Sequence, residues 1–309
     1  MSRKKVLITG GSGTVGRAFI AAFRNEFDFS VVSRNEKMQH ELKQSYREVE
    51  CYLGAIDNRE ALFNIYDKVR PDIVIHAAAM KHVDLAEKDP NQTVRINVVG
   101  SLNVIDASVA FDVPVTVAIS TDKACNHQNI YGMSKFMMER CFMHANAGRN
   151  RFSACRFANV AHSNGSVIPL WLKMHAEGKP LRITDPSMNR MMFSQLDAAK
   201  LIRRAVSMTE DGDGAFILTR LMKNVNILDL AHAISDRVEV VGSRPGEKMN
   251  EDLVAVNELP FTKILDDDYV RIGQTVNDDL HSRLLMPLNS LTAEQMTATE
   301  LTELVYPKE

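Results

Sequence analysis

The amino-acid sequence predicts an α/β fold, a doubly wound parallel sheet with helices on both faces, followed by a smaller C-terminal part. Short apolar runs alternate with longer helical patterns through the first half of the chain. A glycine-rich turn follows the first apolar run, and after about residue 160 loops rich in Ser, Asn, Gly and Pro replace the alternation. Strand–helix alternation is typical of parallel sheets, because each parallel connection needs a crossover.

The predicted elements follow one another in the order that such a sheet needs. Buried strands are expected at 5–9, 30–33, 72–76, 115–119 and 152–157. Helices are expected at 16–24, 93–110 and 130–145, where apolar residues recur with helical spacing. A later apolar run, 215–218, is a candidate for return to the same sheet.

Composition narrows the classes of function. The chain has 309 residues and a net charge of −2, which gives no general reason to expect binding to nucleic acid or to an anionic membrane. Its four cysteines form no CxxC pair and no metal-ligand spacing, so we expect reduced thiols, a cytoplasmic location and no metal. Apolar stretches of about 18 residues are absent, so no transmembrane helix is expected.

The glycine-rich turn after the first predicted strand is the candidate nucleotide site. Glycines at every third position allow a tight turn, close approach of the backbone to a pyrophosphate, and close packing of the helix on the strand. The helix N-terminus adds free N–H groups and a positive dipole end. A glycine-rich turn without a ligand is the alternative. The residues expected around the pyrophosphate are Gly10, Ser12, Gly13, Thr14, Val15 and Gly16.

The end of the second predicted strand favours NADP over NAD. NAD-selective sites usually place a carboxylate there, whereas this chain has Ser33 and Arg34. A guanidinium can clamp a 2′-phosphate, although Arg34 as an ordinary solvated loop residue is the alternative. After the predicted strand at 72–76, Ala77 and Ala78 let the chain pass close to a cofactor. Asn97 is a polar residue in a mostly apolar helical pattern, where it could bridge backbone and catalytic groups or make a local structural bond.

Polar residues after the predicted strand at 115–119 are the candidate catalytic group. Thr121, Asp122 and Lys123 lie where ligands bind in open α/β sheets. Tyr131 and Lys135 follow on a predicted helix, and their i,i+4 spacing puts them on one face. An ammonium near a phenol lowers the phenol's pKa, which would make Tyr131 a general base near neutral pH. The plainer interpretations are an incidental Tyr–Lys spacing and a surface ion pair.

The glycine motif and the Thr–Tyr–Lys set resemble those of the extended short-chain dehydrogenase/reductases, which have a Rossmann-like fold. Within that group, 120–124 and 131–135 resemble the UDP-N-acetylglucosamine 4,6-dehydratases of surface-polysaccharide biosynthesis, especially the soluble, 5-inverting branch that feeds pseudaminic acid synthesis. The resemblance runs from about residue 4 to about residue 271. Other stretches that agree with it are 77–83, 165–169, 184–186 and 244–248.

The resemblance implies a reaction in which Tyr131 removes the proton of the sugar 4-hydroxyl, with Thr121 bonded to that oxygen, while NADP oxidises carbon 4. Lys123, expected to be neutral with a lowered pKa, then removes the carbon-5 proton. Asp122, expected to have a raised pKa, protonates the departing 6-hydroxyl. The product would be a 4-keto-6-deoxy sugar nucleotide. Tyr131 favours inversion at carbon 5, because some relatives carry Met at this position.

The resemblance also implies the remaining binding residues and the domain division. An NADP-binding domain is expected over 1–165, with returning segments within about 194–236, and a mainly substrate-binding part over 166–309. A homo-oligomer acting on a UDP-linked amino sugar is expected. The expected cofactor contacts beyond the glycine turn are Ser33, Arg34, Lys37, Asp57, Ala77, Ala78, Lys81, Asn97, Tyr131 and Lys135. The expected substrate contacts are Lys81, Asn159, Val167, Thr184, Arg190, Arg244 and Glu247.

Three positions depart from the family pattern. Ala55 stands where a carboxylate for the adenine amine is expected, and Phe157 and Ala158 replace Tyr and Gly. These departures bear on substrate preference more than on reaction type. Two other functions stay open: a UDP-sugar 4-epimerase, which would have no use for Asp122 and Lys123 in an elimination, and a non-catalytic NADP-binding regulator.

Overall fold

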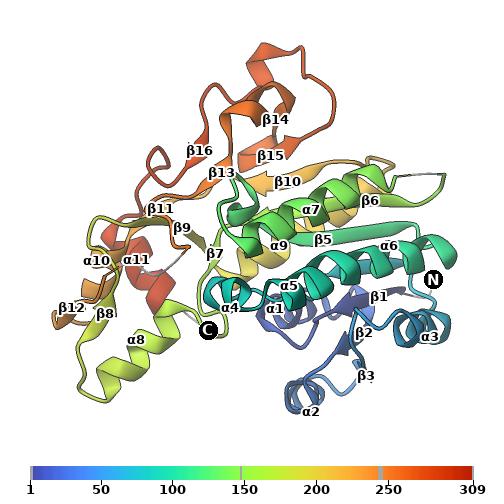
Figure 1. Ribbon diagram of the computed structural model, residues 1–309, viewed down its shortest axis with the longest axis horizontal. Coiled ribbons are helices and arrows are strands. Elements are labelled where there is room, and N and C mark those ends of the chain that lie inside the picture. Colours follow the sequence, from blue (N-terminus) through green and yellow to red (C-terminus); the bar gives the residue numbers. More distant parts are fainter. Residues whose placement is uncertain (1–2, 147, 243–245, 308–309) are drawn as a thin grey trace.

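One large sheet with helices on both faces forms the body of the molecule, and smaller sheets lie beside it (Figure 1). The computed structural model describes residues 3–146, 148–242 and 246–307. The strands are β1 Lys4–Thr9, β2 Phe27–Ser33, β3 Glu50–Leu53, β4 Ile73–His76, β5 Val115–Thr121, β6 Arg151–Phe157, β7 Asn159–Val160, β8 Leu181–Ile183, β9 Asn189–Phe193, β10 Ile217–Arg220, β11 Asn224–Asn226, β12 Val238–Val240, β13 Asp252–Val254, β14 Thr262–Leu265, β15 Tyr269–Ile272 and β16 Leu288–Asn289.

Helices connect most of these strands. The α-helices are α1 Thr14–Phe23, α2 Glu36–Ser45, α3 Arg59–Val69, α4 Val83–Lys88, α5 Pro90–Val94, α6 Gly100–Ala110, α7 Ile130–His144, α8 Val167–Ala176, α9 Gln195–Glu210, α10 Ile227–His232 and α11 Ala298–Val305. One π-helix, η1, spans Arg95–Val99, and short 3₁₀-helices are η2 Asp122–Ala124, η3 Val256–Phe261, η4 Asp266–Asp268 and η5 Leu280–Ser282.

The nine-stranded sheet confirms the predicted fold class. Its order is β14-β15-β10-β6-β5-β4-β1-β2-β3. From β3 through β10 all neighbouring strands pair in parallel. Strand β15 runs antiparallel to them, and β14, which pairs antiparallel with β15, has the direction of the main strands again. The order 3-2-1-4-5-6 is that of a doubly wound dinucleotide-binding fold, in which ligands bind where the strand order reverses, here between β1 and β4.

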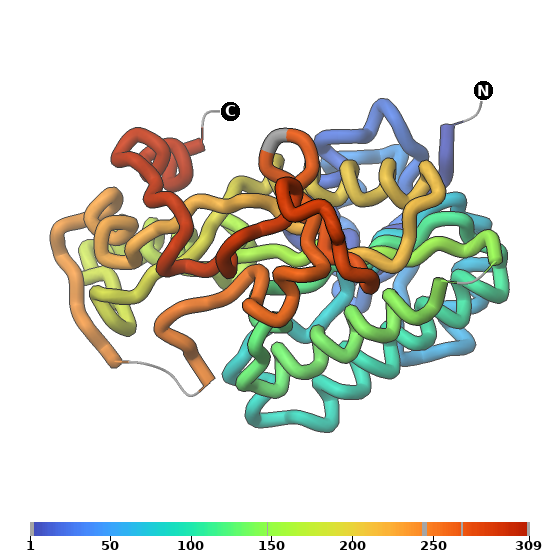
Figure 2. The backbone as a smooth tube through the Cα atoms, turned by 90° about the horizontal axis from the view of Figure 1, so that it is seen from above, coloured from blue at the N-terminus to red at the C-terminus, as the bar shows by residue number. Residues whose placement is uncertain are grey.

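Burial explains why the central strands form. Val6, Leu7 and Ile8 of β1 are fully buried, because helices cover both faces of the sheet. Helix α1 packs against α9 on one face, and α3, α6 and α7 pack in sequence on the other. In Figure 2, the yellow helix α9 lies on one side of the sheet, and the teal helix α6 and the green helix α7 lie on the other.

Two parts of the sheet architecture differ from the sequence-based expectation. The single helix expected at 93–110 is divided into α5, η1 and α6, with the π-turn centred on the buried Asn97. π-turns inside α-helices often occur at functional sites. The run at 215–218 leads into β10, which pairs with β6, but β14 and β15 also join the sheet and were not predicted.

A second, smaller core lies beside the carboxyl ends of the parallel strands. Its sheets are β11-β9-β7 and β12-β8, with α8, α10 and α11 packed on them, whereas the pair β13-β16 packs on the main core. Trp171 of α8 is the largest side chain in this core. The domain division at residue 165 stays a prediction. Within the described ranges, none of the helices combines the length and the apolar character needed to cross a bilayer.

Candidate active site

The glycine-rich turn between β1 and α1 is shaped to receive a phosphate group. Gly13 caps α1 without any side-chain hydrogen bond to the first turn, so the first N–H groups of the helix have no side-chain cap. Gly10 has a φ of 68°, and a Cβ built there would lie 2.8 Å from the Cα of Ala78. The turn therefore passes close to the end of β4, and a pyrophosphate fits its free N–H groups.

The predicted residues Ser12 and Ser33 meet at the end of β2. Ser12 Oγ donates to Ser33 Oγ at 2.9 Å. Gln39 of α2, which the sequence analysis missed, donates through Nε2 to Ser33 Oγ at 2.9 Å and to the carbonyl of Tyr52 at 2.7 Å. The available signal was its spacing of three residues from Leu42, which places Gln39 on the buried face of α2. Arg34 and Lys37 are exposed beside this network.

Other predicted cofactor residues form contacts around the turn. Asp57 makes a 2.9 Å ion pair with Arg95. Lys81 Nζ donates to the carbonyl of Asn164 at 2.6 Å, and the N–H of Asn164 donates to Thr14 Oγ1 at 3.0 Å. The segment after β7 is thus joined both to the glycine turn and to the chain after β4.

Asn97 bridges the backbone after β4 and helix α7. Its Oδ1 accepts the N–H of Met80 at 2.8 Å, and its Nδ2 donates to the carbonyl of Met80 at 2.9 Å and to Ser134 Oγ at 2.9 Å. Ser134 Oγ donates in turn to the carbonyl of Tyr131 at 2.7 Å. Asn97 therefore fixes the first turn of α7 relative to the end of β4.

The candidate catalytic group lies at the carboxyl end of β5, as predicted. Asp122 Oδ1 accepts from Thr121 Oγ1 at 2.8 Å, from the Lys123 N–H at 2.9 Å and from Lys123 Nζ at 3.2 Å. Lys123 Nζ also donates to Glu251 Oε2 at 2.9 Å. Glu251 is a buried member of this group that was not predicted, because its neighbours in the sequence gave no sign that it meets β5.

The charges in this group agree with one expectation and contradict another. Burial and the adjacent Glu251 carboxylate raise the pKa of Asp122 to about 7, in the direction expected for an acid. The expected lowered pKa of Lys123 is wrong. Burial lowers the pKa of Lys123, but Asp122 and Glu251 together raise it above its ordinary value, so this lysine is an ammonium.

Tyr131 and Lys135 both lie buried on one face of α7, but the expected effect of the lysine is wrong. Burial raises the pKa of Tyr131 to about 12, and the charge that opposes this rise belongs to Lys123, with a hydrogen bond to Thr121 acting in the same direction. Burial lowers the pKa of Lys135 to about 8, and Glu139 opposes that shift. Lys135 Nζ lies 3.0 Å from Met138 Sδ.

Gly132 determines how closely α7 approaches the catalytic group. A Cβ built on Gly132 would lie 2.1 Å from the carbonyl oxygen of Lys123. We expect Gly132→Ala to push η2 away from α7, to lower stability by about 1–3 kcal/mol and to reduce turnover. Chemical denaturation and product formation measure the two effects. Met133→Ala, on the exposed face of the same helix, is the control. Equal behaviour of the two variants would contradict the prediction.

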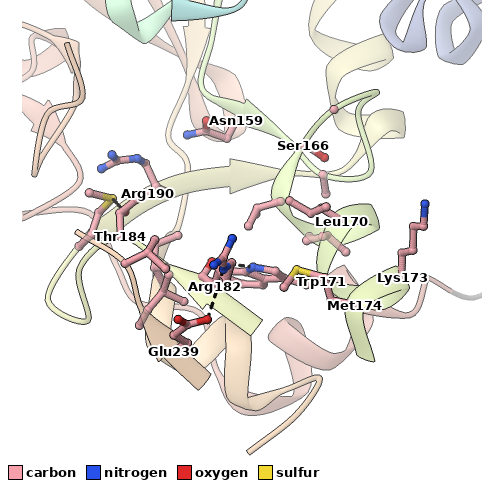
Figure 3. A pocket seen from close by; sticks show the side chains of 18 of the residues that line it. Asn159, Ser166, Leu170, Trp171, Lys173, Met174, Arg182, Thr184, Arg190 and Glu239 are labelled. Atoms are coloured by element: carbon pink, nitrogen blue, oxygen red, sulfur yellow. Dashed lines mark hydrogen bonds and ion pairs between the residues drawn. The ribbon is translucent and has the colours of Figure 1, made fainter. Parts of the chain in front are cut away.

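A cavity of about 1070 Å³ in the smaller part brings together most of the predicted substrate residues. Those that line it are Asn159, Val167, Thr184, Arg190 and Glu247. In Figure 3, Asn159 and Arg190 lie on one side of the cavity, and Arg182 lies beside Glu239 below them. Arg244 lies outside the described residues.

Arg190 connects this cavity to the catalytic group. Its Nη1 and Nη2 donate to the carbonyls of Met249 and Lys248 at 2.9 and 2.7 Å, and its Nε lies 3.9 Å from Glu251 Oε1. The guanidinium thus holds the segment that carries Glu251. The cavity also contains residues that were not predicted: Trp171 Nε1 donates to the Arg182 carbonyl at 3.0 Å, and the Arg182 side chain pairs with Glu239 at 3.2 Å.

Comparison with known proteins decides the family. Residues 6–271 match the family described as polysaccharide biosynthesis protein. The chain belongs to this family. A member from Campylobacter jejuni, named UDP-N-acetylglucosamine 4,6-dehydratase (inverting), is 35% identical over 273 residues, which are 84% of this chain and 80% of the relative. The resemblance stated from the sequence, to an extended short-chain dehydrogenase/reductase of the dehydratase type, is confirmed.

Two further similarities extend the comparison. A UDP-glucose 4-epimerase from Rickettsia massiliae is 32% identical over 293 residues, 89% of this chain and 84% of the relative. The X-ray structure of Pen from Bacillus thuringiensis superimposes with a TM-score of 0.89 at 28% identity and covers 98% of this chain and 97% of that one. The similarity to Pen extends through the smaller part as well as the large sheet.

Proposed function

We propose that this chain is a sugar-nucleotide 4,6-dehydratase, which converts a UDP-N-acetylhexosamine, UDP-N-acetylglucosamine in the first instance, to its 4-keto-6-deoxy product with inversion at carbon 5. The observation that carries the proposal is the buried group at the end of β5, where an acid, an ammonium and a phenol converge. An epimerase has no use for the acid–lysine pair, whereas an elimination needs both a proton donor and a proton acceptor.

NADP is the cofactor that the residues fit best. The turn from Gly10 to Gly16 offers a pyrophosphate the N-terminus of α1, and Arg34 and Lys37 supply exposed cations at the end of β2, where a 2′-phosphate would lie. Bound there, NADP would oxidise carbon 4 and later reduce carbon 6.

Each remaining step belongs to a side chain of the group. For Tyr131 to take the proton of the sugar 4-hydroxyl, its phenol must first lose its own proton, a form that the adjacent Lys123 charge favours, and Thr121 bonds to the same sugar oxygen. The 4-ketone makes the carbon-5 proton acidic. Asp122, whose pKa is raised to about 7, gives a proton to the departing 6-hydroxyl. For Lys123 to accept the carbon-5 proton, its ammonium must first pass a proton to a neighbouring carboxylate, and Glu251 Oε2 lies 2.9 Å away.

The inverting stereochemistry is the finer part of the proposal. The Campylobacter relative is named as inverting, and Tyr131 is the residue that favours that branch. The substrate's diphosphate is expected in the cavity beside Asn159 and Arg190. Arg190 lies next to Glu251, so this part of the cavity adjoins the catalytic group.

Incubation with UDP-N-acetylglucosamine and NADP in heavy water tests the function. We expect a product that has lost one water and carries deuterium at carbon 5, with the configuration at that carbon inverted by NMR. The similarity to the Rickettsia epimerase makes epimerisation the second candidate, and it would leave the mass of the sugar unchanged. Retention of configuration would remove the inverting assignment alone, and unaltered substrate would contradict both enzymatic functions.

A further inference from the structure

Glu251 is held firmly at the point where the smaller part meets β5. It lies directly before β13 and is 5% exposed. Its N–H donates to Ser290 Oγ at 3.0 Å, and its carbonyl accepts the N–H of Ser290 at 2.9 Å. Its carboxylate accepts from Lys123 Nζ at 2.9 Å and lies 3.9 Å from Arg190 Nε. Both its backbone and its side chain are therefore fixed.

The two oxygens of Asp122 are unequally bonded. Oδ1 accepts three donors, whereas Oδ2 is buried and no hydrogen-bond donor of the described residues reaches it. A buried carboxylate oxygen without a donor is costly. The neighbouring carboxyl group is that of Glu251, and two carboxylates in one buried site cannot both ionise readily. A proton shared between Asp122 and Glu251 would supply the hydrogen bond that Asp122 Oδ2 lacks.

The surrounding charges decide which carboxyl group holds that proton. Lys123 from η2 and Arg190 from β9 face Glu251 and favour its ionised form, so the pKa of Glu251 lies below its ordinary value although burial raises it. Asp122 and the phenol of Tyr131 on α7 are the other titratable groups that face it. The proton therefore lies on Asp122.

We propose that Glu251 is a positioning residue of the acid–base group, which holds the Lys123 ammonium in place and keeps a proton on Asp122. The proton distribution rests on the contacts and charges of the group and not on the proposed reaction. The use of this proton rests on the proposed dehydration, in which Asp122 is the acid that protonates the departing 6-hydroxyl.

Carbon-13 NMR of carboxyl-labelled aspartate in the full chain tests the proton distribution without turnover. The signal that disappears in Asp122→Asn assigns Asp122. In Glu251→Gln we expect the Asp122 titration to move to lower pH by at least about one unit, because a negative charge that opposes its ionisation has gone. The matched control is Asp252→Asn, which neutralises the next residue in the chain, a partner of Asn126, and should leave the titration unchanged.

Glu251→Asp keeps the negative charge and shortens the side chain. It also supplies a second test in case the Gln variant does not fold. It retains the carboxylate, so it should keep Asp122 titrating closer to the wild-type pH than Glu251→Gln does. Equal Asp122 titrations in wild type and Glu251→Gln, or equal shifts in the Gln and Asp variants, would overturn the proposal.

The pH dependence of product formation tests the use of the proton. Glu251→Gln should reduce turnover about 100-fold near neutral pH, and its pH profile should move as a whole to lower pH, because both Asp122 and Lys123 lose a carboxylate that raises their pKa values. Asp252→Asn should retain the wild-type profile.

A wild-type chain that forms no dehydrated product defeats the proposed function only, since the NMR titration still decides the role of Glu251. An unshifted profile in active Glu251→Gln defeats the role of Glu251 in catalysis.

Discussion

Replacement of Tyr131 by Phe is expected to reduce dehydration about 1000-fold, because the phenol is the only group of the proposed mechanism that exchanges a proton with the sugar 4-hydroxyl. Tyr131 is buried on α7, within hydrogen-bonding reach of Thr121, and α7 packs against η2. Phe retains the ring, so the fold should be unchanged, and NADP binding, in which Tyr131 is one of many expected contacts, should fall far less than turnover. Product formation by mass spectrometry and NADP binding by calorimetry measure the two properties.

Tyr66→Phe is the matched control for this change. Tyr66 is a fully buried tyrosine of α3 whose hydroxyl lies 3.3 Å from Ser108 Oγ, far along the chain from the catalytic group. The Tyr66→Phe variant should keep wild-type turnover. Undiminished product formation by Tyr131→Phe would mean that another group accepts the proton and that the proposed base is wrong.

Replacement of Arg156 by Met should destabilise the chain by about 3–5 kcal/mol. Arg156 on β6 is 1% exposed and makes paired bonds to Glu139 at 2.9 and 2.7 Å and to Glu258 at 2.8 and 2.9 Å. Its removal leaves Glu139, which is 0% exposed, as a buried carboxylate without its cation. Urea denaturation monitored by circular dichroism measures the loss of free energy of unfolding.

Arg3→Met is the control for the loss of an arginine ion pair. Arg3 pairs with Asp28 at 2.8 Å, but both side chains are about half exposed, so the change should be within about 1 kcal/mol of wild type. In the double variant Arg156→Met/Glu139→Leu, removal of the unpaired carboxylate should recover part of the lost stability. Equal losses for Arg156→Met and Arg3→Met would show that burial adds nothing to the contribution of the pair.

The parts of the site that depend on local spacing could be predicted from the sequence. Glycines at every third position after a strand identified the phosphate turn, and the i,i+4 spacing placed Tyr131 and Lys135 on one face of α7. Thr121 and Asp122 were expected at the end of β5 because ligands bind at the carboxyl ends of parallel strands.

The parts of the site that depend on contacts between distant segments of the chain could not be predicted from the sequence. Glu251 meets Lys123 across 128 positions of the chain, and no periodic pattern marks that meeting. The pKa expectations for Tyr131 and Lys123 were wrong for a related reason, because spacing shows which groups are neighbours in a helix but not how deeply they are buried or which carboxylates come from elsewhere.

The network around Arg156 has a consequence for how the chain is organised. Glu139 lies two helical turns after Tyr131 on the same face of α7, and Arg156 joins it to Glu258 in η3, close to the strands that complete the sheet. Strand β10 and helix α9, which cover the open edge and one face of the early strands, also come from beyond residue 194. The large sheet is therefore not built from the early residues alone: late segments of the polypeptide are structural members of it, and we expect the early strands to fold only together with them.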